Sequence, residues 1–399
     1  MRNRIIMNRW LFVLMCAVFA GCATPPRSSD QFCEGPDYLV EAFFEGGHFS
    51  ACAIQPDGSL HIDIVPENGP PINPSPWYSF RLHPKNSIDL DLRLSFAEGY
   101  ARYWPKVSHD GRNWQPLDEE RVSLGDDGRS FLLHISLTAG PLWVSAQEPL
   151  GSDFYLDWFQ EMATDETLSL RLLGRSAKGR PIYAAFAGNA AEYILLLGRQ
   201  HPPEITGALA MRAFVATVLA HTELATQFRE SYGVVVIPFL NPDGVALGHW
   251  RNNAGGIDLN RDWGPFTQPE TRLVRDWLQE RDARGDIIRL MLDFHSTREN
   301  LFYAQADSEP TNPDGFTQEW VSRAIERLPG FEFRQENNEN SGQANTKNYF
   351  HSRYGIPAIT YELGDETERS RVAESSRVFA EEMMRLLLEL KERDQPEVH

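Results

Sequence analysis

Cysteine is scarce in this chain, which has four such residues among 399. Two of them, Cys16 and Cys22, lie near the N-terminus, so only Cys33 and Cys52 remain for the body of the protein. No cysteine follows Cys52, which argues against a metal site built from thiolates. In an oxidising compartment, two cysteines this close in sequence suggest a disulfide, and the alternative is a pair of buried thiols.

An excess of positive charge is also lacking. The chain has 38 lysines and arginines against 56 acidic residues, which gives a net charge of -18. Nucleic-acid binding needs a basic surface, so this balance argues against a nucleic-acid partner. The composition, 42% hydrophobic and 24% charged, is that of a globular protein, and the length predicts two or three domains.

The apolar run at residues 10–19 is too short to span a membrane comfortably. Three arginines precede it, which is the order typical of a secretory signal. The next residues, Phe-Ala-Gly-Cys at 19–22, resemble a bacterial lipobox, in which Cys22 becomes the lipidated first residue. The alternative is a plain secretory signal with an incidental cysteine. By the same resemblance, Ala23 after the cysteine implies the periplasmic side of the outer membrane, with the lipid as the only membrane contact.

Four segments are expected along the chain: a signal peptide at 1–21, a Pro/Ser-rich tether at 22–31, a first domain at 32–150 and a second at 151–399. The first domain has short alternating apolar runs separated by Asp-Gly turns, which predicts a small all-β sandwich. In the second domain, buried strands alternate with helical segments. This pattern predicts an α/β fold with a doubly wound, mostly parallel sheet and helices on both faces.

The expected elements of the second domain are strands at 182–186, 193–197, 234–238, 288–294 and 358–361, and helices at 205–221, 270–282, 317–328 and 371–392. The segment 334–348 is rich in Asn, Gln, Glu and Gly, which predicts a surface loop.

Candidate metal ligands follow two of the buried strands. His201 and Glu204 come after the strand at 193–198, and His295 comes directly after the strand at 288–294. In an open α/β sheet, sites form where the strands end. Two imidazoles and one carboxylate suit one catalytic Zn²⁺ per chain, because three protein ligands leave one position open for water.

Further motifs follow these ligands in a fixed order. They are Asn241-Pro-Asp-Gly244, Arg251, Asp258-Leu-Asn-Arg261, His295-Ser296 and Thr360-Tyr-Glu-Leu363. With His201-Pro-Pro-Glu204, this ordered set resembles the zinc metallocarboxypeptidase family. The segments 73–78 and 110–114 are similar to the β-domain that precedes the catalytic domain in the cytosolic-carboxypeptidase-like branch. The resemblance covers nearly all of the chain after the signal, and the set is specific although each motif alone is weak.

The resemblance implies a role for each matched residue. His201, Glu204 and His295 would hold zinc, and Glu362 would be the general base for zinc-activated water. Arg251 would polarise the scissile carbonyl of the peptide.

Other matched residues would orient the ligands or bind the substrate. Asp258 would fix the tautomer of a ligand histidine. Asn260 and Arg261 would bind the free terminal carboxylate of a peptide substrate, for which arginine offers two parallel donors. Ser296 is expected beside the substrate.

Lys347 matches the bottom of the family's side-chain pocket, where a cation would favour an acidic terminal residue. The segment 334–348 departs from the family because it lacks the tyrosine that covers the substrate.

A zinc metallocarboxypeptidase acting on cell-wall or imported peptides is therefore expected. One alternative is a zinc amidohydrolase or deacylase of small N-acyl amino acids, which shares the H-x-x-E spacing. Another is an inactive lipoprotein that binds peptides or glycans. The β-domain and the context of Glu362 favour the peptidase over the deacylase. Retention of all three ligands and of Glu362 argues against the inactive receptor.

Overall fold

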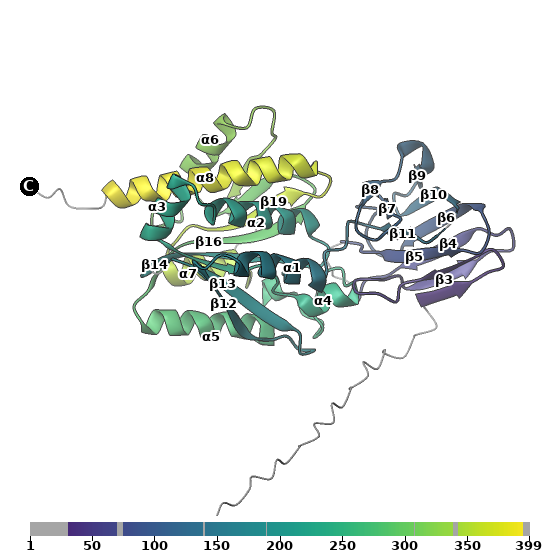
Figure 1. The fold of residues 1–399 in the computed structure, drawn as a ribbon, viewed down its shortest axis with the longest axis horizontal. Helices are drawn as coiled ribbons and strands as arrows, with labels where there is room; N and C mark the ends of the chain where they lie inside the picture. Colours follow the sequence, from purple (N-terminus) through teal and green to yellow (C-terminus); the bar gives the residue numbers. More distant parts are fainter. Residues whose placement is uncertain are drawn as a thin grey trace, which may run out of the picture.

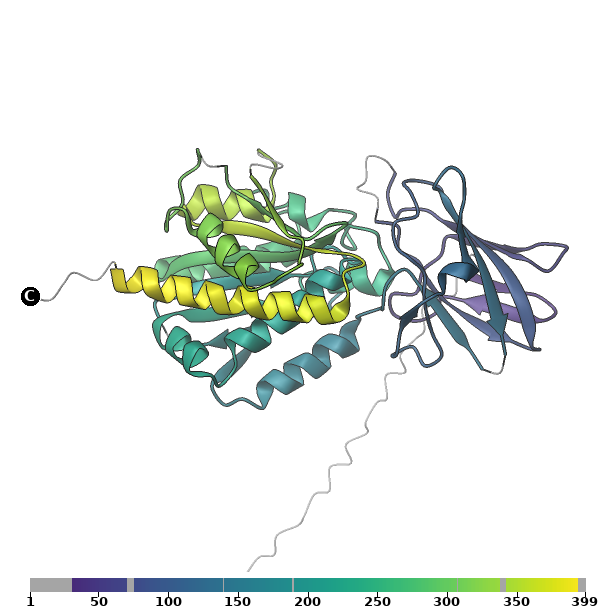
Figure 2. The same cartoon turned by 90° about the horizontal axis from the view of Figure 1, so that it is seen from above.

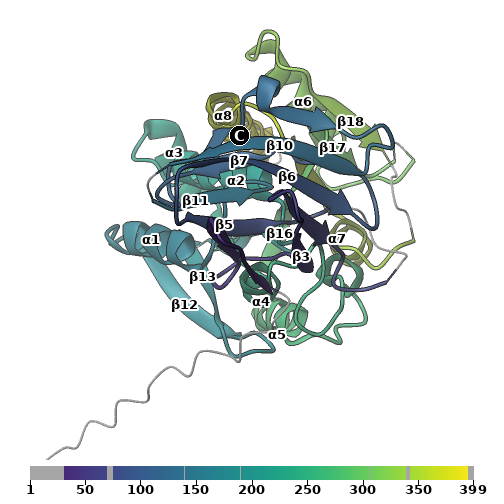
Figure 3. The same cartoon turned by 90° about the vertical axis from the view of Figure 1, so that its right-hand side faces the viewer.

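The computed structural model describes residues 31–69, 75–138, 140–188, 190–306, 308–337 and 342–393. The expected signal peptide, most of the tether and Cys22 lie outside these residues. A strand-rich N-terminal part occupies one end of the elongated molecule and an α/β part occupies the other (Figures 1 and 2). In the end-on view, the strands of the N-terminal part lie in front of the α/β part (Figure 3).

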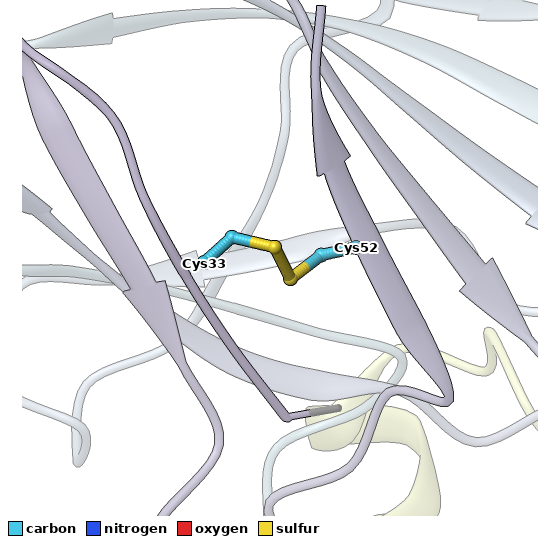
Figure 4. Close-up of a disulfide and its surroundings, with 2 residues drawn as sticks. All are labelled: Cys33 and Cys52. Carbon is cyan, nitrogen blue, oxygen red and sulfur yellow. A yellow bond between two sulfur atoms is a disulfide. The ribbon is translucent and has the colours of Figure 1, made fainter. Parts of the chain in front are cut away.

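The N-terminal part consists of two sheets. The first has the order β1-β2-β5-β11-β7-β8 and the second β3-β4-β6-β10-β9. Their strands are β1 (Phe32–Glu34), β2 (Tyr38–Glu41), β3 (Ala51–Ile54), β4 (Leu60–Ile64), β5 (Ser79–Pro84), β6 (Ile88–Phe96), β7 (Lys106–Ser108), β8 (Gln115–Pro116), β9 (Val122–Leu124), β10 (Ser130–Leu137) and β11 (Leu142–Ser145). In β6, Leu90, Leu92 and Leu94 are buried while the residues between them are exposed, as a sheet with one wet face requires. A disulfide between Cys33 and Cys52 joins β1 of one sheet to β3 of the other (Figure 4).

The α/β part is built on one eight-stranded sheet with the order β12-β13-β15-β14-β16-β19-β17-β18. Its strands are β12 (Leu168–Arg175), β13 (Pro181–Ala187), β14 (Glu192–Gly198), β15 (Gly233–Ile237), β16 (Ile287–Thr297), β17 (Leu301–Ala304), β18 (Arg334–Asn337) and β19 (Ala358–Gly364). The helices are α1 (Ser152–Ala163), α2 (Ile205–Val218), α3 (Glu223–Ser231), α4 (Pro242–Leu247), α5 (Pro269–Ala283), α6 (Phe316–Glu326), α7 (Thr346–Tyr354) and α8 (Arg369–Arg393).

Helices cover both faces of this sheet. One core contains residues of α1, α2, α3, α6 and α8, and the other contains residues of α5 and α7. Figure 1 shows α2 and α8 on one side of the sheet and α5 on the other. Every residue of β15 and β19 is buried, because these strands are covered on both faces. The predicted α/β class with helices on both faces is confirmed.

The sheet is less parallel than the alternation of strands and helices predicts. Strands β15, β14, β16 and β19 are parallel to one another. Strand β13 is antiparallel to both β12 and β15, and β17 is antiparallel to β19 but parallel to β18. The connection from β12 to β13 is too short for a crossover, so these strands pair as a hairpin. The expected loop at 334–348 begins with a strand, β18, which pairs with β17. No single helix among the described residues is long and apolar enough to cross a membrane.

Candidate metal centre

Three side chains converge at the ends of β14 and β16. One ligand atom from each of His201, Glu204 and His295 lies within 4.8 Å of the others, and all three residues are buried. The two Nδ1 atoms of the histidines are 3.1 Å apart. The Glu204 carboxylate spans them, with Oε1 at 2.9 Å from Nδ1 of His201 and Oε2 at 2.6 Å from Nδ1 of His295. These are the residues that the spacing of the sequence predicted as ligands.

The turn after β14 brings the first two ligands into place. Arg199 adopts a left-handed conformation with φ of 56°, which is uncommon for a residue with a side chain. The buried Arg199 guanidinium donates from Nε to the Pro202 carbonyl, within the turn, and from Nη1 to the Tyr155 hydroxyl of α1. These hydrogen bonds hold the turn in shape and attach it to α1. Glu204 then occupies the N-cap position of α2.

Two carboxylates orient the histidines from behind. Nε2 of His201 is 2.9 Å from Asp258, and Nε2 of His295 is 2.9 Å from Asp293. A proton on each Nε2 is thereby favoured, which leaves each Nδ1 as an electron-pair donor. Asp258 was expected in this position. Asp293 was not, although it precedes His295 by two residues on a strand and must therefore point to the same face.

The pKa values of the clustered groups are shifted by their neighbours. Burial disfavours the ionised form of His295, yet Asp293 and Glu204 together raise the pKa of its imidazole well above the usual range. Burial likewise opposes ionisation of Glu204, but the two histidines hold the pKa of its carboxyl well below its usual range. Converging imidazole and carboxylate donors in a buried setting fit a divalent cation such as zinc.

Glu362 lies beside this cluster on the neighbouring strand. In the parallel pairing of β16 with β19, His295 is directly opposite Glu362. The carboxyl is buried, and its Oε2 has no hydrogen-bond partner among the residues that the structure describes. Burial first, and then the charge of Glu204, raise the pKa of Glu362 to about 8. A carboxyl in this state can exchange a proton near neutral pH.

The predicted carbonyl and carboxylate binders also reach the cluster. Arg251 donates from Nε to Asp258 at 2.6 Å, so one carboxylate holds both this arginine and His201. Asn260 lies with its Nδ2 3.5 Å from Nε2 of His295. Its Oδ1 accepts hydrogen bonds from the amide and hydroxyl of Thr346, both at 2.9 Å. Arg261 donates from Nη1 to the Asn260 carbonyl at 2.7 Å.

Ser296 faces away from the metal ligands. Its hydroxyl accepts hydrogen bonds from Thr206 and from the Gly207 amide, both at 2.8 Å, in the first turn of α2. Alternation along β16 turns the Ser296 side chain to the α2 face and the His295 side chain to the other face. The expected place of Ser296 beside the substrate stays a prediction.

Lys347 lies in the first turn of α7 and is buried, with 3% of its surface exposed. Its Nζ donates to the Ala304 carbonyl at 3.2 Å, at the end of β17. A solvated lysine is stabilised by water, whereas this buried ammonium group must be stabilised by hydrogen bonds to the protein groups around it.

Gln200 is a buried connector that sequence reasoning missed. Its Nε2 donates to Asp293 at 2.5 Å and to the Thr346 hydroxyl at 2.7 Å, and its Oε1 accepts from Trp263. It thus links the carboxylate behind His295 to the residue that holds Asn260. Its position beside His201 was the available signal, but an amide next to a ligand has no distinctive pattern.

A buried His-Glu-His cluster beside a buried carboxyl, at the strand ends of an α/β sheet, is the kind of site that metal-dependent hydrolases use. The sequence model of the zinc carboxypeptidase family matches residues 155–379, which is more than half of the chain. This protein therefore belongs to the zinc carboxypeptidase family, a family of hydrolases.

Two individual relatives show how far the similarity extends along the chain. An uncharacterised protein of Zymomonas mobilis is 25% identical over 344 residues, covering 81% of this chain and 87% of the relative. Human cytosolic carboxypeptidase 2 is 30% identical over 151 residues, which cover 33% of this chain but only 16% of that much longer protein.

Solved structures share the fold over most of the chain. A metallo-carboxypeptidase from Burkholderia cenocepacia aligns with a TM-score of 0.76 at 16% identity, over 88% of this chain and 100% of its own. A metallo-carboxypeptidase from Pseudomonas aeruginosa, in complex with (2-guanidinoethylmercapto)succinic acid, aligns with a TM-score of 0.68 at 17% identity, over 88% and 99% of the two chains. At these identities the alignments establish the fold alone.

Proposed function

We propose that this protein removes the C-terminal residue of a peptide, with one Zn²⁺ held by His201, Glu204 and His295. The observation that carries the proposal is the convergence of these three ligands beside the buried carboxyl of Glu362 on the next strand. When bound, zinc supplies a Lewis acid that lowers the pKa of water and polarises a carbonyl.

The side chains of the site supply proton transfer, stabilisation of the developing negative charge and binding of the terminal carboxylate. Glu362 takes the proton of the attacking water and delivers it to the leaving amine, because its buried carboxyl lies directly opposite His295 on the neighbouring strand. Arg251, held by Asp258, donates hydrogen bonds to the oxygen on which negative charge develops. Asn260 and Arg261 bind the terminal carboxylate of the peptide, which restricts cleavage to the last bond.

The preference that we propose is for acidic terminal residues. Lys347 follows Thr346, which contacts Asn260 through both its amide and its hydroxyl. Lys347 is therefore the next residue along α7 from a contact of the proposed carboxylate site, and its side chain is buried, a setting in which pairing with a carboxylate is strong. Glutamate and diaminopimelate are the candidate terminal residues.

We also propose that the enzyme works as a lipoprotein on the periplasmic side of the outer membrane, where cell-wall stem peptides and imported peptides are available. The lipobox-like segment ending at Cys22 supports this location. The disulfide between Cys33 and Cys52 supports it independently, because such bonds persist in oxidising compartments.

A peptide panel tests the activity. Peptides ending in Glu, diaminopimelate, Lys, Phe or D-Ala are incubated with the purified, zinc-loaded protein, and released residues are quantified. Release of single C-terminal residues is expected, with loss of activity on chelation and recovery with Zn²⁺. Glu362→Gln should lower kcat by about three orders of magnitude or more while zinc remains bound, since it removes the proton acceptor.

The same assay can refute the proposal. A protein that takes up no stoichiometric zinc, or that hydrolyses only internal bonds or N-acyl amino acids, would contradict it. N-acetylated amino acids serve as the control substrates for the deacylase alternative.

A further inference from the structure

The strand-rich N-terminal part touches the α/β part at the backbone segments that carry the proposed catalytic groups. Two of its side chains, Glu67 and Arg102, reach these segments from different positions. We propose that they are positioning residues, so that the N-terminal part completes the active site. This inference deepens the proposed function and rests on it.

Glu67 holds the segment that contains Arg251. Its Oε2 accepts a hydrogen bond from the Trp250 amide at 2.8 Å. Its Oε1 accepts from the amides of Arg251 and Asn252 at 3.0 and 2.7 Å. Three successive amides are thus satisfied by one carboxylate from another part of the chain. Since Asp258 holds the Arg251 side chain at Nε, this residue is fixed at both its backbone and its guanidinium.

Arg102 holds the ends of β16 and β19. It forms a two-pronged ion pair with Asp365, from Nε at 2.7 Å and from Nη2 at 3.2 Å. Nη2 also donates to the Ser296 carbonyl at 3.1 Å. Asp365 follows Glu362 by three residues, and Ser296 follows His295 directly. One guanidinium therefore ties together the strand ends that present the base and a metal ligand.

Burial gives this ion pair its rigidity. The Arg102 and Asp365 side chains are 8% and 5% exposed. Breaking such a pair leaves an uncompensated buried charge, whereas replacing both partners with apolar groups of similar size is often neutral for stability. The two kinds of substitution can therefore separate a structural role from a positioning role.

The first experiment compares wild type with the double variant Arg102→Met/Asp365→Leu. Thermal unfolding should remain close to wild type, while kcat falls by about 10- to 100-fold with little change in KM. The dissociation constant for Zn²⁺, measured by chelator competition, should rise by about tenfold. Because one charge of each sign is removed, weaker zinc binding would report altered geometry and not altered net charge.

A second pair across the same interface is the matched control. Lys106 has a side chain that is also 8% exposed, and its Nζ donates to Glu366 at 3.0 Å. Lys106→Met/Glu366→Gln should leave kcat and zinc affinity within about threefold of wild type. If Arg102→Met/Asp365→Leu behaves like this control in both measurements, Arg102 only joins the two parts and the positioning role is overturned.

The second experiment is a double-mutant cycle between Glu67 and Arg251. Glu67→Gln should lower kcat by about tenfold or more, because it loosens the Arg251 segment. In the Arg251→Ala background the same change should have little further effect, whereas a full and additive loss would overturn the role of Glu67. Asn68→Ala is the control, since Asn68 crosses the same interface but donates its hydrogen bond to the Gly256 carbonyl.

The two experiments distinguish failure of this inference from failure of the proposed function. If the wild-type protein hydrolyses no peptide, the proposed function falls. In that case the zinc dissociation constants of the Arg102 and Lys106 double variants still decide whether the N-terminal part positions the metal centre.

Discussion

Glu362 shows most clearly how one side chain depends on its surroundings. A carboxyl on an exposed strand would ionise near its usual pKa of 4.5, but burial and the charge of Glu204 raise the pKa to about 8. The protein thus keeps a proton acceptor in a place where ionisation is unfavourable without a cation. A bound divalent cation opposes the effect of Glu204, so metal binding and the readiness of Glu362 to accept a proton are linked.

The raised pKa of Glu362 predicts a pH-dependent stability for the metal-free protein. Below pH 4.5 the carboxyl is neutral in both the folded and the unfolded state, so it costs nothing. As the pH rises toward 8, only the unfolded state ionises readily, and stability is lost. Glu362→Gln should therefore stabilise the metal-free protein by about 2–5 kcal/mol at pH 9 and by much less at pH 4.5, as measured by urea unfolding.

The proposed preference for acidic C-terminal residues depends on the charge of Lys347. Lys347→Met removes the buried cation with little change in length, so kcat/KM for peptides ending in Glu should fall by about 10- to 100-fold. Peptides ending in Ala should be affected far less, and the peptide panel measures both. Lys178→Met changes the same charge at an exposed position and should leave the selectivity as it is. Equal loss on both classes of peptide would refute the proposed pairing.

Residue types and their order predicted part of the candidate site, and the direction of side chains along a strand explains the rest. The candidate ligands His201, Glu204 and His295 were predicted from their residue types and order, and the structure brings them together. Asp293 could have been found, because alternation along a strand places it on the same face as His295. The same rule turns Ser296 the other way, which a motif match alone does not reveal.

Among the elements, buried apolar runs predicted the central strands β14, β15, β16 and β19. These strands are covered on both faces, so apolar side chains persist along their length. Strand β18 was missed because its side chains are polar, and it is held by backbone pairing with β17 at the sheet edge. No local pattern indicates that β16 and β19 are neighbours, although this adjacency places Glu362 opposite His295.

The packing of α2 against β16 leads to a prediction at the scale of elements. A Cβ added at Gly207 would lie 2.3 Å from the His295 carbonyl oxygen, so even alanine must push the helix away from the strand. Gly207→Ala should cost about 1–3 kcal/mol of stability. It should also weaken zinc binding by about tenfold or more, because both ligand-bearing elements shift. Gly69→Ala is the control, since no atom of the residues that the structure describes, its chain neighbours aside, lies within 4 Å of its added Cβ. Unchanged zinc affinity in Gly207→Ala would contradict this account.

For the whole molecule, composition and periodicity predicted a strand-rich part followed by an α/β part. Composition and periodicity could not predict that side chains of the strand-rich part contact the candidate site of the α/β part. The contact between Glu67 and Trp250 spans 183 residues, and neither residue lies in a recognisable pattern. Long-range polar contacts of this kind depend on how the two parts dock, which local sequence does not encode.

Anchoring of the whole molecule is the last prediction. If Cys22 is lipidated, the protein should fractionate with membranes and incorporate a labelled fatty acid, because acyl chains supply the membrane affinity. Cys22→Ser should abolish the label and release the protein, whereas Cys16→Ser should leave both unchanged, although Cys16 lies in the same N-terminal segment. The zinc site is built from residues far along the chain, so released Cys22→Ser protein should keep wild-type kcat on peptides. Incorporation of the labelled fatty acid into Cys22→Ser would show that the segment acts as something other than a lipobox.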